Sequence, residues 1–273
     1  MTNKVIISGG LGNQMFQYAF ALALRGKGYS VKIDTSLYNL VRMHNGYELY
    51  RVFGITEDVI DRKGIHLYFL RLLLKLKPSC LIKVDTIKYD PNNLMTERHY
   101  FSGVWLSANY FDSIKTDVRD SFKFKSIDQR NRKIAVDMKA LNSVSIHIRR
   151  GDYVSWGISL LGYQYYKSAI ELINAKVDNP KYYIFSDDIG VAKEIAEQMK
   201  IDYEIISHNQ GEKSFQDMFL MSQCKHNIIA NSSFSWWGAW LNDNDNKVVI
   251  APKEWVSGDD DLHKPQLDSW ILL

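Results

Sequence analysis

Cysteine and proline are scarce in this chain of 273 residues, which has two cysteines and five prolines. Cys80 and Cys224 lie far apart, and no cysteine or histidine accompanies them at the spacing of a zinc motif. This excludes a disulfide framework and a zinc site of the usual kind, and it favours a reducing compartment. No low-complexity tract is present, and with 46% hydrophobic residues the composition is that of a folded globular protein.

Charge of a single sign and long apolar runs are also absent. The net charge is +3 without any basic run, which argues against a nucleic-acid partner but leaves room for a small anionic ligand. The N-terminus has no basic segment followed by an apolar one, so no signal peptide is expected. The most apolar stretch, residues 65–76, is too short to span a bilayer and contains Arg71 and Lys75. We expect a cytoplasmic protein in which this stretch is a packed helix, with peripheral contact at the inner face of the cytoplasmic membrane as the alternative.

Short apolar strands alternate with amphipathic helices over much of the chain. Such alternation predicts parallel sheets covered on both faces, and the length suggests two domains of roughly 150 residues each. We place the boundary so that the domains are 1–125 and 126–273, with a polar crossing between them at 126–139. In the second domain the pattern predicts strands at 143–148, 182–185, 203–206, 227–230 and 248–251, and helices at 163–175, 189–200, 214–224 and 234–241. The segment 37–124 has no regular pattern.

The chain opens with a strand at 5–7, a glycine-rich loop at 8–14, a helix at 15–24 and a second strand that ends at Asp34. Glycines such as Gly10, followed by a helix N-terminus, allow close approach of an anionic ligand. A dinucleotide fingerprint would need a third glycine where Met15 stands, which disfavours an NAD-dependent oxidoreductase. A tight turn without a ligand is the structural alternative.

Two adjacent arginines follow the predicted strand 143–148. Ligands of open α/β sheets gather at the carboxyl ends of strands, and a pyrophosphate would give Arg149 and Arg150 bidentate partners. His147 shares a face of the strand with Arg149, so we assign ligand contact to Arg149 first. The structural alternative is an ion pair between Arg150 and Asp152.

Two further strand ends carry polar residues. Ser186, Asp187 and Asp188 follow the strand 182–185, where carboxylates accept hydrogen bonds from a nucleoside, hold a divalent metal, or cap the next helix. Asn231, Ser232, Ser233 and Phe234 lead from the strand 227–230 into a helix whose N-terminus favours an anion. The tryptophans of that helix fit a core better than a sugar-binding platform.

Together these segments resemble one family: the bacterial alpha-1,2-fucosyltransferases of glycosyltransferase family 11. The resemblance spans nearly the whole chain and rests on GGLGNQMFQYAF from Gly9, HIRRGDY from His147, YYIFSDD from Tyr182 and NSSFSWWGAWL from Asn231, in the order and spacing of that family. It implies a GT-B-like fold, in which two Rossmann-like lobes face a central cleft. It also implies GDP-β-L-fucose as donor, a glycan ending in β-galactoside as acceptor, inversion at the fucose anomeric carbon, and neither cofactor nor metal.

Several residue roles follow from the same resemblance. Arg149 matches the arginine that binds the pyrophosphate, His147 the histidine near the nucleotide, and Asp188 the acid that contacts guanosine. Ser232, Ser233 and Phe234 match the helix start at the β-phosphate, and Asn13 matches the asparagine near the fucose-phosphate. The acceptor is expected on the first domain, where His44, Tyr47 and Glu48 belong to its most motif-like piece.

The general base is not identified by the sequence. Asp152 stands near the donor segment and is preferred, with Glu48 and Asp34 as alternatives. Motifs that bind the donor carry no information about the acceptor. A fucosyltransferase that forms another linkage and another GDP-sugar transferase therefore remain alternatives. A carbohydrate-binding module is a third alternative, and it predicts sugar binding without nucleotide dependence.

Overall fold

The computed structural model describes residues 2–41, 43–76, 81–84, 89–95, 100–151, 160–256 and 265–273. The chain forms two compact units, and the boundary between them lies between Lys125 and Ser126. Each unit is built on a parallel sheet, so the predicted α/β class is confirmed. That the first unit receives the acceptor and the second the donor stays a prediction.

The first unit contains a five-stranded sheet in its described residues, with strand order β3-β2-β1-β5-β4. Its strands are short and pair in parallel: β1 (Asn3–Ile6), β2 (Val31–Asp34), β3 (Val59–Ile60), β4 (Leu81–Val84) and β5 (Tyr100–Gly103). Its α-helices are α1 (Leu11–Gly26), α2 (Leu49–Phe53), α3 (Ile65–Leu76) and α4 (Lys115–Ser121). The described part of this unit also contains four 3-10 helices: Ser36–Asn39, Pro91–Leu94, Ala108–Tyr110 and Asp112–Ile114. The strand–helix–strand start of the chain is therefore confirmed.

Helix α1 starts earlier than the sequence suggested. We expected a helix from Met15, but α1 begins at Leu11, so Asn13 and Gln14 lie in its first turn rather than in a loop. Most of α1 is buried, and Phe20 stacks on Trp105 with ring centroids 3.9 Å apart. The loop between β1 and α1 is thus only four residues long, residues 7–10.

The second unit contains a six-stranded sheet in its described residues, with strand order β11-β10-β9-β6-β7-β8. The strands are β6 (Ser143–Ile148), β7 (Lys181–Ser186), β8 (Tyr203–Ile206), β9 (His226–Ile228), β10 (Val249–Ala251) and β11 (Ile271–Leu272). The α-helices are α5 (Gln129–Ala140), α7 (Tyr163–Asn174), α8 (Ile189–Met199), α9 (Phe215–Gln223) and α10 (Ser233–Leu241), and a 3-10 turn spans Gly211–Lys213. All nine elements predicted here from alternation are present, with ends shifted by at most two residues.

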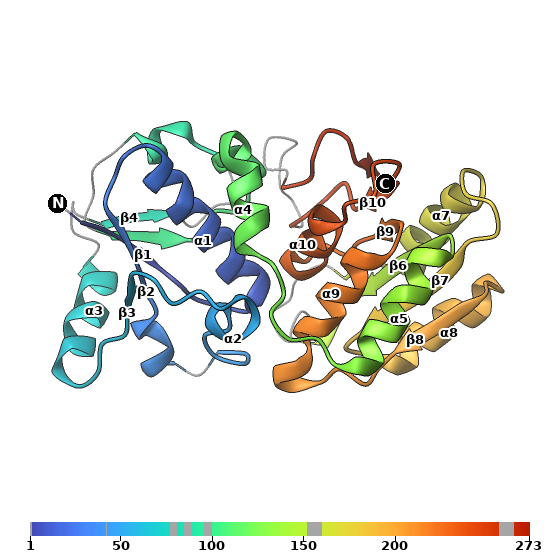
Figure 1. The fold of residues 1–273 in the computed structure, drawn as a ribbon, viewed down its shortest axis with the longest axis horizontal. Coiled ribbons are helices and arrows are strands. Elements are labelled where there is room, and N and C mark those ends of the chain that lie inside the picture. Colours follow the sequence, from blue (N-terminus) through green and yellow to red (C-terminus); the bar gives the residue numbers. More distant parts are fainter. Residues whose placement is uncertain are drawn as a thin grey trace. The chain divides into compact units, whose positions relative to one another are not determined.

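Alternate residues of β7 belong to two different apolar cores, as the pleat of a strand requires. Tyr182 and Ile184 pack with residues of α7 and α8, while Tyr183 and Phe185 pack with residues of α5 and α9. The sheet of the second unit is therefore covered on both faces (Figure 1). Its strand β6 is buried along its whole length, although polar and apolar residues alternate in its sequence, SVSIHI.

Two expectations about polar and apolar segments are wrong. Residues 126–139 are not merely a crossing, because they include α5, which packs Ala135 and Met138 against the sheet. Helix α3 has the predicted bounds, but it is not fully packed: Leu70 is buried, whereas several of its large apolar side chains are exposed. No helix among the described residues is long and apolar enough to cross a membrane.

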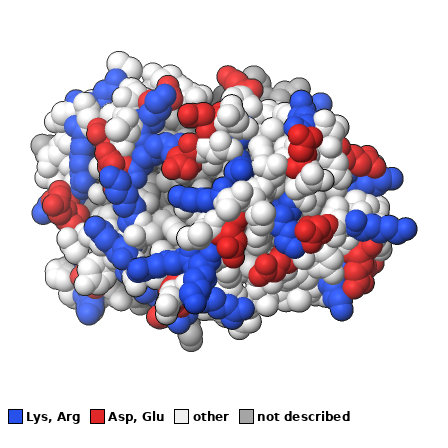
Figure 2. Space-filling view, turned by 45° about the vertical axis from the view of Figure 1, so that its right-hand side comes forward, with Lys and Arg blue, Asp and Glu red and all other residues white. Residues whose placement is uncertain are grey.

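Charged side chains of both signs are distributed over the face drawn in Figure 2. Acidic and basic groups are interspersed on the right-hand part of the face drawn in Figure 2, and basic groups are more numerous on its left-hand part. This distribution accords with the small net charge of +3.

Candidate active site

The register of β6 and β7 places the paired arginines beside the paired acids. Ile148 lies opposite Ser186 in this parallel pair, so the next residues of the two strands, Arg149 and Asp187, leave the sheet side by side. Arg149 Nη1 lies 2.9 Å from Asp187 Oδ2, and Arg150 Nε lies 3.3 Å from Asp188 Oδ2. All four side chains are partly exposed at this edge of the sheet.

Each carboxylate oxygen of the two acids already has a partner. Asp187 Oδ1 accepts the backbone N–H of Arg150 at 2.9 Å, and Asp188 Oδ1 accepts the N–H of Val191 at 3.1 Å, which caps α8. The capping alternative is therefore confirmed for Asp188. Each of these oxygens has a second lone pair, so it can accept a hydrogen bond from a nucleoside beside its present partner.

Asp187 closely approaches Gly151. A Cβ atom added to Gly151 would lie 2.6 Å from Asp187 Oδ2, so the carboxylate that contacts Arg149 would have to shift. Asp152 lies outside the described residues, and so does the alternative pair of Asp152 with Arg150. Among the described contacts, Arg150 pairs with Asp188 instead.

His147 lies at the same strand end but is buried. Burial, and to a smaller extent the charge of Arg149, lowers the pKa of His147 to about 3. The imidazole is therefore neutral at pH 7 and is a poor acceptor for the proton of a sugar hydroxyl. Its Nδ1 atom is buried without a hydrogen-bond partner among the described residues, and its ring lies 6.0 Å from that of Phe234.

The contact of His147 with Phe234 brings the start of α10 to the end of β6. Ser232 is the N-cap of this helix, and its hydroxyl accepts the N–H of Phe234 at 3.4 Å. Ser233 begins the helix, while the Asn231 amide donates to the backbone carbonyl of Trp255 at 3.2 Å. The helix N-terminus thus adds a positive partial charge to the edge that carries the arginines.

The tryptophans of α10 belong to the core. Trp236 and Trp237 are fully buried, and Trp240 is 6% exposed. A sugar ring therefore cannot stack on them. The hypothesis of a carbohydrate-binding module rested on these tryptophans, and their burial argues against it.

In the first unit, the glycine loop lies against the predicted acceptor segment. Gly9 has φ +77°, which favours glycine, and a Cβ there would lie 3.0 Å from Asn13 Nδ2. A Cβ on Gly10 would lie 3.4 Å from His44 Cγ, so the imidazole of His44 packs directly on the loop. Gly10, Asn13 and His44 are thus brought together, as a shared site requires.

Gln14 is a residue that the sequence analysis did not single out. Its Nε2 donates to the carbonyls of Gly9 at 3.0 Å and Gly46 at 2.9 Å, and its Oε1 accepts the N–H of Glu48 at 2.8 Å. The side chain is fully buried. Gln14 therefore fixes the segment around His44 and Glu48 against the glycine loop.

The carboxyl groups of this unit that were alternatives for the base are already engaged. Glu48 is 2% exposed, and its Oε1 lies 2.7 Å from Arg51 Nη2. Asp34 is fully buried, with Oδ2 at 3.4 Å from Arg62 Nη1. Burial also raises the pKa of Tyr47, whose hydroxyl is buried without a hydrogen-bond partner among the described residues. Neither acid is placed to receive a proton from a solvent-borne acceptor.

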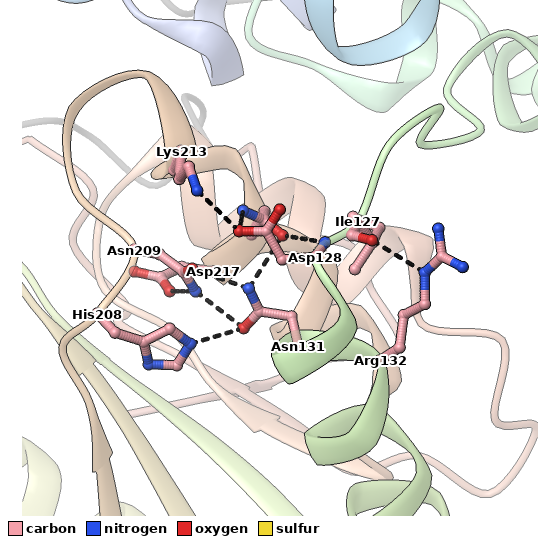
Figure 3. A network of polar contacts seen from close by, with 9 residues as sticks. Ile127, Asp128, Asn131, Arg132, His208, Asn209, Lys213 and Asp217 are labelled. Atoms are coloured by element: carbon pink, nitrogen blue, oxygen red, sulfur yellow. Dashed lines mark hydrogen bonds and ion pairs between the residues drawn. The ribbon is translucent and has the colours of Figure 1, made fainter.

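A second feature that sequence reasoning missed is a polar network that joins the starts of α5 and α9 to the end of β8 (Figure 3). The Asn131 amide donates to Asn209 Oδ1 and Gln216 Oε1, both at 2.9 Å. His208 Nε2 lies 2.9 Å from Asn131 Oδ1, and Asn209 Nδ2 donates to Asp217 Oδ1 at 2.7 Å. Burial raises the pKa of Asp217 to about 7, although the bond from Asn209 opposes the rise.

Replacing Gln14 by leucine should destabilise the protein, because the N–H of Glu48 and the carbonyls of Gly9 and Gly46 would lose their partners. We expect a loss of roughly 2 kcal/mol or more in the free energy of unfolding, measured by urea titration with tryptophan fluorescence. Gln198→Leu, at an exposed position of α8, is the matched control and should leave stability nearly unchanged. Equal stability of Gln14→Leu and wild type would refute the bridging role.

The raised pKa of Asp217 predicts a pH dependence of stability. Between pH 3.8 and about 7 the folded protein holds a proton on Asp217 that the unfolded chain has released, so the free energy of unfolding falls as pH rises through this window. Asp217→Asn removes this contribution and should flatten the profile, measured by urea unfolding across the window. Asp243→Asn, an exposed position, should keep the wild-type profile. An unchanged slope in Asp217→Asn would show that the carboxyl is already ionised.

Comparison with known proteins gives consistent results. Residues 2–272 match the family described as Glycosyl transferase family 11. The chain is 32% identical to the alpha-1,2-colitosyltransferase of Escherichia coli, covering 98% of this chain and 97% of that protein. It is 24% identical to the galactoside 2-alpha-L-fucosyltransferase Sec1 of Mus musculus, and the match covers 97% of this chain and 72% of that protein.

Among solved structures, the fold is similar to that of the NodZ alpha-1,6-fucosyltransferase in a crystal soaked with GDP-fucose. The TM-score is 0.53 at 15% identity, over 88% of this chain and 93% of that one. This likeness supports the GT-B-like fold class with two Rossmann-like units. The match over nearly the whole length shows that the chain belongs to glycosyl transferase family 11 and is a glycosyltransferase.

Proposed function

We propose that the protein transfers L-fucose from GDP-β-L-fucose to O2 of a terminal galactose, forming an alpha-1,2 linkage with inversion. The observation that carries the proposal is the edge of the second sheet, where Arg149 and Arg150 follow β6 and α10 begins after the neighbouring strand β9. Two guanidinium groups and a helix N-terminus are a fitting cradle for a diphosphate. The family membership supports a sugar-nucleotide donor.

The proposed reaction is a single displacement. The acceptor hydroxyl oxygen attacks C1 of fucose, the bond from C1 to the β-phosphate oxygen breaks with its electron pair, and GDP leaves. Negative charge grows on the β-phosphate, where Arg149 and the start of α10 at Ser232 supply electrostatic stabilisation. Asp187 contacts the Arg149 guanidinium at 2.9 Å and thereby fixes its position at this edge.

The proton of the acceptor hydroxyl needs a base. Glu48 and Asp34 are buried and paired, and His147 is neutral with a strongly lowered pKa. We therefore retain Asp152 as the proposed base.

GDP-colitose is a second candidate donor, because the chain is similar to a colitosyltransferase over nearly its whole length. Colitose is L-fucose without the 3-hydroxyl group. A sugar pocket that hydrogen-bonds this hydroxyl rejects the deoxy analogue by up to about 10⁴-fold, whereas a pocket that makes no such bond accepts both. The ratio of kcat/KM for GDP-fucose and GDP-colitose therefore separates the two proposals.

Mass-spectrometric assay with lactose as acceptor should show a deoxyhexose added from GDP-fucose, undiminished by EDTA, and no product from GDP-mannose or NAD. Arg149→Ala should lower kcat by about 10²–10³-fold, the usual cost of one donor to a developing oxyanion. Lys193→Ala, an exposed residue of α8, is the matched control and should keep full activity. Near-wild-type turnover of Arg149→Ala would overturn the assigned role. Binding of GDP-fucose without product would mean that the donor is right and lactose is the wrong acceptor.

Asp152→Asn tests the base separately. Loss of a general base should lower kcat by about 10²–10⁴-fold while the dissociation constant for GDP, measured by calorimetry, stays near the wild-type value. If GDP binding weakens in parallel with kcat, Asp152 orients the arginines and a different group takes the proton.

A further inference from the structure

Helix α3 carries exposed apolar side chains that the proposed function does not use. Fourteen large apolar side chains are exposed in the described part of the chain, and five of them lie on this one helix of twelve residues. The others are scattered singly, as on most soluble proteins. The five are Ile65, Tyr68, Phe69, Leu72 and Leu76, with exposed fractions from 39% to 71%.

These side chains form one continuous stripe. Their spacing of i, i+3, i+4, i+7 and i+11 confines them to an arc of about 100° on a helical wheel. Leu70, which is 1% exposed, lies on the opposite face and anchors the helix to the first unit. The stripe is therefore an additional surface and is not needed to hold α3 in place.

The charged residues of the segment 62–76 all have one sign, and the exposed Asp61 comes just before it. From Arg62 to Leu76 the charged residues are Arg62, Lys63, Arg71 and Lys75, and the segment contains no aspartate or glutamate. Lys63, Arg71 and Lys75 are exposed. Arg71 and Lys75 lie one turn apart and flank the stripe on the same side, where their ammonium and guanidinium groups can reach past the apolar surface.

We propose that α3 is an interfacial helix, which lies in the plane of a membrane rich in anionic lipid. The apolar stripe would enter the boundary between headgroups and acyl chains, and the flanking basic groups would meet the lipid phosphates. A helix of twelve residues is about 18 Å long, enough to lie on a bilayer and too short to cross one. This inference rests on α3 alone and does not depend on which sugar is transferred.

The test is co-sedimentation of the full-length protein with vesicles of equal parts phosphatidylglycerol and phosphatidylcholine, compared with phosphatidylcholine alone. Wild type should bind the anionic vesicles, and added salt should weaken the binding. The double variant Phe69→Gln with Leu72→Gln removes part of the apolar stripe, and glutamine is a good helix former, so the helix is kept. This variant should lower the partition coefficient between vesicles and water at least about tenfold. Arg71→Gln with Lys75→Gln should lower it about 25-fold, at about fivefold for each basic group near the surface.

Val136→Gln, at an exposed apolar position of α5, is the matched control and should bind as wild type does. Circular dichroism and transfer activity with a soluble acceptor should be unchanged in all variants, because the residues are exposed and lie outside the donor site. Failure of wild type to bind anionic vesicles would overturn the proposal. The proposal would also be overturned if the protein did not bind the vesicles but formed a dimer, detected by sedimentation velocity, that Phe69→Gln with Leu72→Gln abolished.

Discussion

The parallel pairing of β6 with β7 is the constraint on which the proposed donor site depends. Because Ile148 and Ser186 end the ladder together, each arginine after β6 emerges beside an aspartate after β7. Two adjacent guanidinium groups would repel each other at a bare sheet edge. Their pairing with Asp187 and Asp188 holds both in place and presents them at the edge where α10 also begins. Glycine at position 151 leaves room for this arrangement.

The second unit was the part of the fold that could be predicted from the sequence. Its strands are buried on both faces and its helices have one apolar face, so period and composition identify β6 and α8 nearly to the residue. The segment 37–124 could not be predicted, because elements as short as β3 have little periodicity and form only against their neighbours. The start of α1 was placed too late because Gly12 and Asn13 resemble a loop, whereas burial of Leu11 and Gln14 favours the helix.

The candidate site could be predicted only where the chemistry lies within a few residues of a strand end. Arg149, Asp187 and Ser232 were chosen as candidates in this way, and their side chains lie where the sheet topology implies, while their roles stay predictions. Gln14 and Asn131 were missed because their partners are distant in the sequence: Gly46 is 32 residues from Gln14, and Asn209 is 78 from Asn131. A buried amide gives no local signal of the segment that it joins. The cost of leaving its partners unpaired is seen only in the folded structure.

Calorimetric titration with GDP tests the central claim most directly, because it measures the diphosphate cradle without any acceptor. Wild type should bind one GDP, and Arg149→Lys should bind it at least about tenfold more weakly, since lysine keeps the charge but loses the two-pronged geometry. Equal affinity of the two proteins, or binding of NAD in place of GDP, would contradict the account of this strand end as a site for a GDP-linked sugar.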